Sequence, residues 1–200
     1  MTRIIAGTAG GRRLVTGPGR ATRPTSDRTR EGLFSTIEAI RGGLAGAAVL
    51  DLYAGSGAVG LEALSRGAAD VILVESDPRA AQVITANVAA IGLPGARLVA
   101  DRVARVLRRG RDGASPRDFV FADPPYALSA DELQRMLAAL VSESWLAPGA
   151  VVAVERATRS GMLTWPDGYE PDRSRKYGEA TLWYGLAAGA LPGATTRTGA

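Results

Sequence analysis

Short apolar runs recur along the middle of the chain and alternate with segments whose apolar residues have helical spacing. Short runs of this kind, bounded by glycine or polar residues, are typical of strands buried on both faces of a parallel sheet. The pattern predicts strands at 48–52, 71–75, 97–100, 118–122 and 151–155, with helices starting near Val59 and at 78–91 and 103–109. Because strands alternate with helices, we expect an α/β fold in which a Rossmann-like sheet is flanked by helices.

The N-terminal end of the chain follows a different pattern. Residues 3–7 and 12–16 look like two short strands joined by a glycine-rich loop, which predicts a β-hairpin. A Gly/Pro linker at 17–19 follows, and Ser26 then offers a helix N-cap. Residues 28–40 predict an amphipathic helix, with its apolar face made by Leu33, Phe34, Ile37 and Ile40.

The C-terminal part again changes pattern. Residues 169–175 and 180–186 predict an antiparallel pair of strands, and the small and polar residues at 188–200 predict a disordered tail. We therefore divide the chain into a basic N-terminal hairpin (1–21), a main α/β domain (22–187) and a tail (188–200).

The amino-acid composition removes several kinds of chemistry. The chain has neither cysteine nor histidine, so it offers no thiolate zinc site, no cysteine nucleophile and no histidine general base. Any reaction must use carboxylates, backbone groups and a cofactor, and we expect no bound metal. Without an apolar run of roughly 18 residues or a secretory signal, we expect no membrane segment and a cytoplasmic protein. Nothing indicates an obligate oligomer, so we expect a monomer.

Positive charge is concentrated near the N-terminus. Seven arginines against one acid give residues 1–30 a net charge of +6, whereas the whole chain carries +4. These arginines are Arg3, Arg12, Arg13, Arg20, Arg23, Arg28 and Arg30. Concentrated positive charge is the electrostatic signature of a surface that meets phosphates, so the hairpin is a candidate RNA-docking element. A solvated basic tail is the simpler alternative. On the docking interpretation, deletion of residues 1–20 should weaken RNA binding and leave the fold intact.

A glycine-rich turn follows the strand at 48–52. Gly55, Gly57 and Gly60 have G-x-G-x-x-G spacing, and Glu75 stands twenty residues after the first of them. The glycines let the backbone approach a ligand closely, and Glu75 can accept both ribose hydroxyls. That set alone fits a dinucleotide as well as S-adenosylmethionine. Asp51 favours S-adenosylmethionine, because an acid at the start of this turn would face the cofactor's charged methionine end.

A second motif, Asp123-Pro124-Pro125-Tyr126, follows the strand at 118–122. The exocyclic amine of a nucleic-acid base is a poor nucleophile, since its lone pair is delocalised into the ring. The Asp123 carboxylate and the Pro124 carbonyl can each accept one N–H and hold the nitrogen in line with a methyl donor. The two prolines fix that carbonyl, and Tyr126 offers a face on which the base can stack. No strong base is needed, because the amine proton becomes acidic as the methyl group transfers.

These motifs, with the residues around them, resemble a known family: the bacterial 16S ribosomal RNA (guanine-N2) methyltransferases of the RsmD type. The similarity covers about residues 3–186. It is carried by the segments 3–7, 11–14, 23–34, 51–68, 75–77 and 123–126 and by Asn87. The resemblance implies a class I S-adenosylmethionine-dependent methyltransferase fold with an N-terminal hairpin. It also implies methylation of a guanine N2 amine, at nucleotide 966 of 16S rRNA in the small ribosomal subunit or its assembly intermediate, with S-adenosylhomocysteine as the product.

The resemblance also implies roles for particular residues. The catalytic set is Asp123, Pro124, Pro125 and Tyr126, and the cofactor set is Asp51, Tyr53, Ala54, Gly55, Gly57, Gly60, Glu75, Ser76, Asp101 and Arg102. The RNA-binding set is Arg3, Arg12, Arg13, Arg20, Arg23, Arg28 and Lys176. The chain departs from the family at one position, since Arg102 stands where an acid or amide usually contacts the adenine. Asp101 is one position early, so either its side chain or the backbone near Arg102 would make that contact.

Other functions share parts of this pattern. A DNA adenine or cytosine methyltransferase or a protein-glutamine methyltransferase would use similar logic, although glutamine methylation usually goes with Asn at the position of Asp123. From a different class, the chain could be an NAD oxidoreductase or a non-catalytic Rossmann module that binds RNA. Methylation at carbon-5 of a pyrimidine is excluded, because that reaction needs a cysteine nucleophile.

Overall fold

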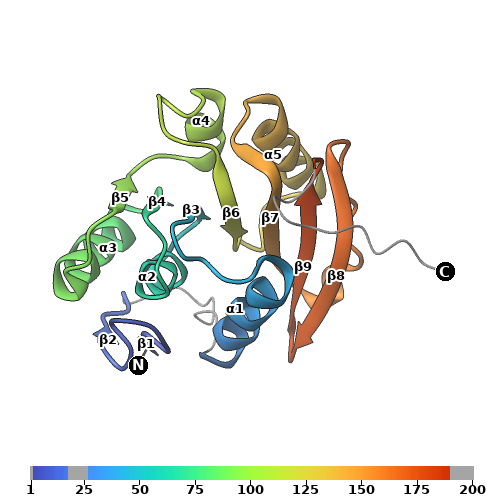
Figure 1. Cartoon of the computed structure of the whole chain (residues 1–200). Helices are drawn as coiled ribbons and strands as arrows, with labels where there is room; N and C mark the ends of the chain where they lie inside the picture. The colour runs from blue at the N-terminus through green and yellow to red at the C-terminus, as the bar shows by residue number, and fades with distance from the viewer. Residues whose placement is uncertain (1, 18–26, 190–200) are drawn as a thin grey trace.

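A seven-stranded sheet forms the centre of the computed structural model, which describes residues 2–17 and 27–189 (Figure 1). Its strands are β3 (Ala48–Leu52), β4 (Asp70–Val74), β5 (Ala96–Val99), β6 (Arg117–Ala122), β7 (Leu146–Ala157), β8 (Tyr169–Tyr177) and β9 (Ala180–Ala187). They lie in the order β5-β4-β3-β6-β7-β9-β8, and the first five are parallel. β9 is antiparallel to both β7 and β8. The predicted α/β fold is confirmed.

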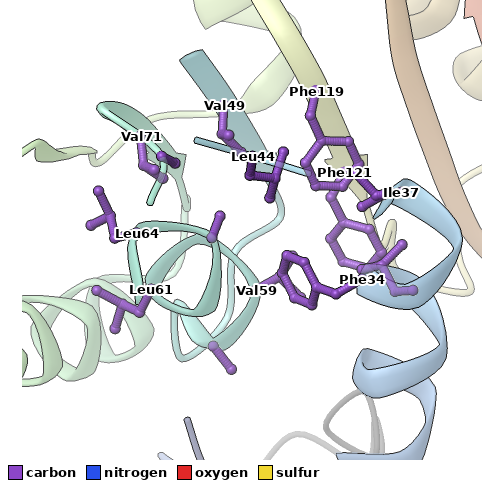
Figure 2. Packing of buried hydrophobic residues seen from close by; sticks show 14 of the residues in the cluster. Phe34, Ile37, Leu44, Val49, Val59, Leu61, Leu64, Val71, Phe119 and Phe121 are labelled. Atoms are coloured by element: carbon purple, nitrogen blue, oxygen red, sulfur yellow. The ribbon is translucent and has the colours of Figure 1, made fainter. Parts of the chain in front are cut away.

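Helices cover both faces of this sheet. They are α1 (Asp27–Arg41), α2 (Ala58–Ser65), α3 (Pro78–Ile91), α4 (Val103–Arg108) and α5 (Ala130–Ser142), with a 3-10 turn, η1, at Thr158–Ser160. α1, α2 and α3 pack on one face, and α4 and α5 pack on the other. On the first face, Phe34 and Ile37 of α1 lie against Phe119 and Phe121 of β6 (Figure 2). Within the part of the chain that the structure describes, no helix combines the length and apolar character needed to cross a membrane.

Side chains of the parallel strands alternate between these two faces. Val49 belongs to the core under α1, α2 and α3, whereas its neighbours along β3, Leu50 and Leu52, belong to the core under α4 and α5. Because successive strand residues point to opposite faces, Asp51 points to the same side as Val49. Alternation therefore directs a carboxylate toward α2, the helix that follows the glycine-rich turn.

The chain changes direction across the sheet between β3 and β6. After β3 it adds β4 and then β5 on one side, and it returns to place β6 on the other side of β3. In open parallel sheets, ligands bind outside the carboxyl ends of the strands at such a switch point. The two sequence motifs of the candidate site follow β3 and β6, so the topology brings them together there.

The predicted elements agree with the structure within a few residues, with one omission. We predict no helix between β6 and β7 from the sequence, yet α5 lies there. Its signals are present: Ser129 and Glu132 form a reciprocal capping box, and the buried residues of α5 are spaced as on one helix face. β7 also starts earlier than the predicted 151–155.

Some predictions fall outside the described residues. These are the Ser26 N-cap, most of the linker at 17–19, and Arg20, Arg23 and residues 190–200. The domain division at 21/22 and the disordered tail stay predictions. β9 ends at Ala187, directly before the predicted start of the tail at residue 188.

The N-terminal hairpin packs closely on the rest of the molecule. β1 (Thr2–Arg3) and β2 (Arg13–Leu14) pair antiparallel, as predicted, although over fewer residues. Ile4, Ala9 and Leu14 are buried in the core under α1, α2 and α3. The structure therefore speaks against the expectation that deletion of residues 1–20 would leave the fold intact.

Buried polar groups hold the hairpin in place. Glu62 of α2 has no exposed surface, and its carboxylate accepts the backbone N–H groups of Ile5 (2.6 Å) and Ala6 (3.0 Å). Asn87 of α3 is also fully buried and exchanges two hydrogen bonds with the backbone of Val15, at 2.8 and 2.9 Å. Without the hairpin, Glu62 and Asn87 would lose these hydrogen bonds, and the core that Ile4, Ala9 and Leu14 help to fill would be exposed to water.

Candidate active site

The glycine-rich turn after β3 has backbone conformations that favour glycine. Tyr53, Gly55 and Gly57 all have positive φ angles, of 60°, 58° and 77°. The turn is closed by the Gly57 N–H, which donates to the Ala54 carbonyl at 2.7 Å, and it is tied to β4 by the Ala54 N–H, which donates to the Val74 carbonyl at 3.0 Å. The structure thus places the predicted cofactor turn at the carboxyl ends of two adjacent strands.

Gly60, the third glycine of the motif, has a packing role. A Cβ atom at this position would lie 2.8 Å from Leu73 Cδ2 and 3.2 Å from Asp51 Oδ2. A close approach of α2 to the sheet is the usual reason for a glycine here. It also lets the Gly60 N–H donate to Asp51 Oδ2 at 2.8 Å.

Asp51 is almost completely buried beneath this helix start, with 1% of its surface exposed. Burial raises the pKa of its carboxyl group to about 7, and the negative charge of Glu75 adds to the rise, whereas the Gly60 N–H opposes it. Near neutral pH the group is therefore poised between its neutral and charged forms, and a nearby positive charge would favour the carboxylate.

Glu75, directly after β4, is 3% exposed and binds backbone groups from two loops. One carboxylate oxygen accepts the Gly55 N–H at 2.9 Å, and the other accepts the Ser76 and Asp77 N–H groups at 2.7 and 2.8 Å. A carboxylate has about four lone-pair positions. The two ribose hydroxyls predicted for Glu75 would therefore have to share it with these three donors.

Two further features decide whether this region fits S-adenosylmethionine. A Cβ atom on Gly55 would meet nothing closer than the Tyr53 carbonyl oxygen at 3.9 Å, so space lies open beside the turn. Two acids, Asp51 and Glu75, flank that turn, which suits a cofactor that carries positive charge and a ribose. The residues present therefore fit the cofactor.

Other members of the predicted cofactor set are engaged elsewhere. The Tyr53 ring packs against the core under α4 and α5, and burial, with the charge of Glu132, raises its pKa to about 12. Asp101 accepts the Arg102 N–H at 2.7 Å and forms ion pairs with Arg105 (3.2 Å) and Arg109 (3.4 Å). Arg102 is the N-cap of α4 and its side chain is exposed. The adenine contact of this pair stays a prediction.

The Asp123-Pro124-Pro125-Tyr126 motif leaves the sheet beside the glycine-rich turn. β6 pairs directly with β3, and the Asp123 N–H donates to the Leu52 carbonyl at 3.4 Å. Tyr126 is 67% exposed, and the Arg159 guanidinium carbon lies 5.9 Å from its ring centroid, within cation–π range. The motif thus presents an open aromatic face one strand away from the cofactor turn.

The predicted RNA-binding residues lie in different surroundings. Four of them are exposed: Arg3, Arg13, Arg28 and Lys176. Two others, Arg20 and Arg23, lie outside the described part of the chain. Arg12 donates to the carbonyl of Ile91 at 2.6 Å and so caps the end of α3. Their contacts with RNA stay a prediction.

Sequence reasoning missed Arg159, which lies beside the motif, and the exposed Met162, three residues further along the chain. Both follow β7, and Met162 is 79% exposed. Only the pairing of β7 with β6 brings this segment to Tyr126, and a single sequence carries no signal for that pairing partner.

Comparisons with known proteins agree with this geometry. Residues 2–185 match the model of a family described as Conserved hypothetical protein 95. The chain is 35% identical, over 88% of its length and 85% of the relative's, to ribosomal RNA small subunit methyltransferase D of Escherichia coli. It also resembles the solved structure of yhhF, a proposed methyltransferase from Escherichia coli, with a TM-score of 0.80 and 32% identity over 94% of this chain and 98% of that one. A hypothetical protein of Thermus thermophilus gives a TM-score of 0.74 at 30% identity, over 95% of this chain and all of that one.

Proposed function

We propose that the chain methylates ribosomal RNA of the small subunit, because it belongs to the family described as Conserved hypothetical protein 95. This is the family of the RsmD-type methyltransferases, which the motifs of the chain resemble. The cofactor is S-adenosylmethionine, and the acceptor is the exocyclic N2 amine of a guanine, at the nucleotide 966 position that the family resemblance implies. The substrate is the small subunit or its assembly intermediate.

One observation carries this proposal: the Asp-Pro-Pro-Tyr motif lies one strand away from a complete cofactor turn. β3 and β6 are hydrogen-bonded neighbours, so the carboxyl ends that carry Asp51 and Asp123 lie side by side. An amine-orienting motif alone would fit any Pro-Pro turn, and the glycine turn alone would fit several nucleotides. Their juxtaposition at the switch point of the sheet favours transfer of a methyl group to an amine.

The residues of the chain would act mainly by orientation. The Asp123 carboxylate and the Pro124 carbonyl accept the two N–H groups of the base amine, and Tyr126 stacks on the base. When bound, S-adenosylmethionine would supply an activated methyl group: the amine lone pair bonds to the methyl carbon as its bond to the sulfonium sulfur breaks, and S-adenosylhomocysteine is the leaving group. As the nitrogen becomes positively charged, its proton is readily lost, and Asp123 is positioned to hold it.

Methyl mapping tests this proposal. The purified chain would be incubated with labelled S-adenosylmethionine and small subunits that lack the modification, and in parallel with naked 16S rRNA, duplex DNA and a mixture of proteins. We expect label at a single guanine N2 of the RNA, and none with Asp123→Ala. Label on DNA or on a protein amide, or at another position of the RNA base, would contradict the proposal.

A further inference from the structure

Two exposed apolar side chains lie at the edge of the sheet that carries the site. Among the described residues, three large apolar side chains are exposed: Val15 (58%), Tyr126 (67%) and Met162 (79%). Val15 belongs to the N-terminal hairpin segment. Tyr126 and Met162 follow β6 and β7, which are adjacent parallel strands. Single exposed apolar side chains are common on protein surfaces, so what these two indicate depends on the groups around them.

Arg159 lies near Tyr126 in space and near Met162 along the chain. Its guanidinium lies 5.9 Å from the centroid of the Tyr126 ring. Met162 is three residues further along, so its Cα atom lies at most about 11 Å from that of Arg159. The loop 158–162 thus places one cation beside the aromatic ring of the motif and carries an exposed apolar side chain three residues further along.

Both ends of this loop are anchored. The Thr158 N–H donates to the Glu179 carbonyl at 2.7 Å, and the Thr158 hydroxyl lies 3.0 Å from that of Thr181. After the exposed tip, Leu163 returns to the core with 4% of its surface exposed. Anchoring lowers the entropy that would be lost when the tip binds a partner.

Further cations flank the anchor. Arg156 of β7 and Lys176 of β8 both pair in register with Thr181 of β9, one from each side. Residues opposite one another in a sheet share a face, so these two side chains lie on the same side as the Thr181 hydroxyl that holds the loop. The positive charge of this row, together with Arg159, suits a phosphate backbone.

We propose that the loop 158–162 opens the RNA around the target nucleotide: Arg159 binds a neighbouring phosphate, and Met162 fills the gap that the extruded base leaves in the stack. The inference rests on the proposed RNA methylation. An enzyme that acts on a base must take it out of its stack, and apolar wedges, methionine among them, commonly enter the vacated step. In the free protein the Arg159 guanidinium lies over one part of the Tyr126 ring, which stays 67% exposed. A base that stacks on that ring displaces the guanidinium, which is then free to meet the phosphate.

Single-turnover kinetics separate the two roles. Unmodified small subunits and naked 16S rRNA would be tested with Arg159→Ala, Met162→Ala and Met162→Leu, and RNA binding would be measured at several salt concentrations. For Arg159→Ala we expect a half-saturating RNA concentration that rises about fivefold, with a salt slope smaller by about 0.7 to 0.9. For Met162→Ala we expect a rate at saturating RNA that falls about tenfold with an unchanged salt slope, and Met162→Leu, of similar volume, should restore most of that rate.

Arg97→Ala is the matched control, because Arg97 is an exposed arginine on β5, and β5 and β7 are the two outermost of the five parallel strands. The inference is overturned if Arg159→Ala behaves like Arg97→Ala, or if Met162→Ala keeps its full rate. If the variants lower methylation of assembled subunits but not of naked RNA, the loop contacts a ribosomal protein rather than RNA, and the inference is also overturned. If the wild-type chain methylates no RNA, the proposed function fails, and the salt slope of binding still tests the Arg159 contact.

Discussion

The two halves of the candidate site lie at the same edge of the sheet, but they differ in how deeply their side chains are buried and in how many hydrogen bonds hold them. On the cofactor side, after β3 and β4, Asp51 and Glu75 are 1% and 3% exposed and together accept four backbone N–H groups. On the substrate side, after β6 and β7, Tyr126 and Met162 are 67% and 79% exposed. The first half is held in one geometry by buried hydrogen bonds, whereas the second is open.

This difference matches the sizes of the two ligands. A small cofactor is bound best by groups that are fixed in advance, because these groups lose no further conformational entropy on binding. A ribosomal subunit, the proposed substrate, would bring its own rigid surface, and the protein would then need only a few exposed contacts at the reacting base. Substitutions on the substrate side should therefore lower the rate of methyl transfer and leave the cofactor affinity unchanged. Substitutions on the cofactor side should mainly lower the cofactor affinity.

The largest effect is expected from Asp123→Ala. Loss of the carboxylate that orients the amine should lower the single-turnover rate at least about 100-fold, as for loss of one positioned transition-state contact. S-adenosylmethionine affinity, measured by calorimetry, should stay within a few-fold of wild type. Asp131→Ala, an exposed acid at the start of α5, is the control. A rate close to wild type in Asp123→Ala would remove this residue from the mechanism.

Glu75→Ala should act on the other half. The substitution removes the ribose acceptor and leaves the Gly55, Ser76 and Asp77 N–H groups without their partner. The loss of S-adenosylmethionine binding should be about 1.5–3 kcal/mol, the range for hydrogen bonds to a charged group. Glu75→Gln should lose less, and Glu38→Ala, an exposed acid of α1, should lose nothing. Unchanged affinity in Glu75→Ala would place the cofactor elsewhere.

Asp51 predicts a pH dependence of cofactor binding. Because burial raises its pKa to about 7, the group is mostly protonated below that pH, and a positively charged cofactor must drive off the proton. Affinity should therefore be greatest above pH 7 and fall by up to about tenfold per pH unit below it. The stability of the ligand-free protein should change in the opposite sense, because a raised folded-state pKa favours the protonated form: its contribution is present at low pH and is lost as pH rises through about 7.

Calorimetric titrations between pH 5.5 and pH 8 would check this, with thermal unfolding of the free protein in the same buffers. Asp51→Asn should flatten both pH profiles. A wild-type affinity that is constant across this window would show that the cofactor does not sense the charge of Asp51.

The smallest effect is expected from Gly55→Ala. The new Cβ has open space around it, so only the positive φ of 58° resists the change, at a cost of about 1 kcal/mol in the free energy of unfolding. Cofactor affinity should fall a few-fold, since the methyl group occupies the ligand's space. Gly60→Ala reverses the pattern: its Cβ would collide with Leu73, and stability should fall more than affinity. Equal losses of stability and affinity in both variants would erase this distinction.

Much of the cofactor side could be predicted from the sequence, because its signals are local. A strand, a glycine turn and an acid at the end of the next strand lie close together along the chain, and parallel strands bring such ends together. The substrate side needs contacts between distant segments. Arg159 reaches Tyr126 only because β7 pairs with β6, and the register of that pairing follows from packing that a single sequence does not reveal.

Charge was the least reliable guide to position. Residues 1–30 carry a net charge of +6, yet Arg30 is fully buried, where it donates to Asp27 and to the Arg3 carbonyl, both at 2.7 Å. Burial lowers its pKa, against the attraction of Asp27 and Glu62. Arg12 serves as a cap for α3. Net charge counts residues without regard to burial, so it cannot distinguish an arginine that meets phosphate from one that holds two elements together.

The anchoring of the hairpin also bears on the order in which the chain folds during synthesis. Ile5 bonds to a side chain 57 residues downstream, Val15 to one 72 residues downstream and Arg12 to a carbonyl 79 residues downstream. A nascent chain emerges N-terminus first, so the hairpin leaves the ribosome well before α2 and α3 exist to receive it. The hairpin must therefore wait to dock until these helices have been translated, and a chain arrested before Asn87 would carry its hairpin strands without a complete docking surface.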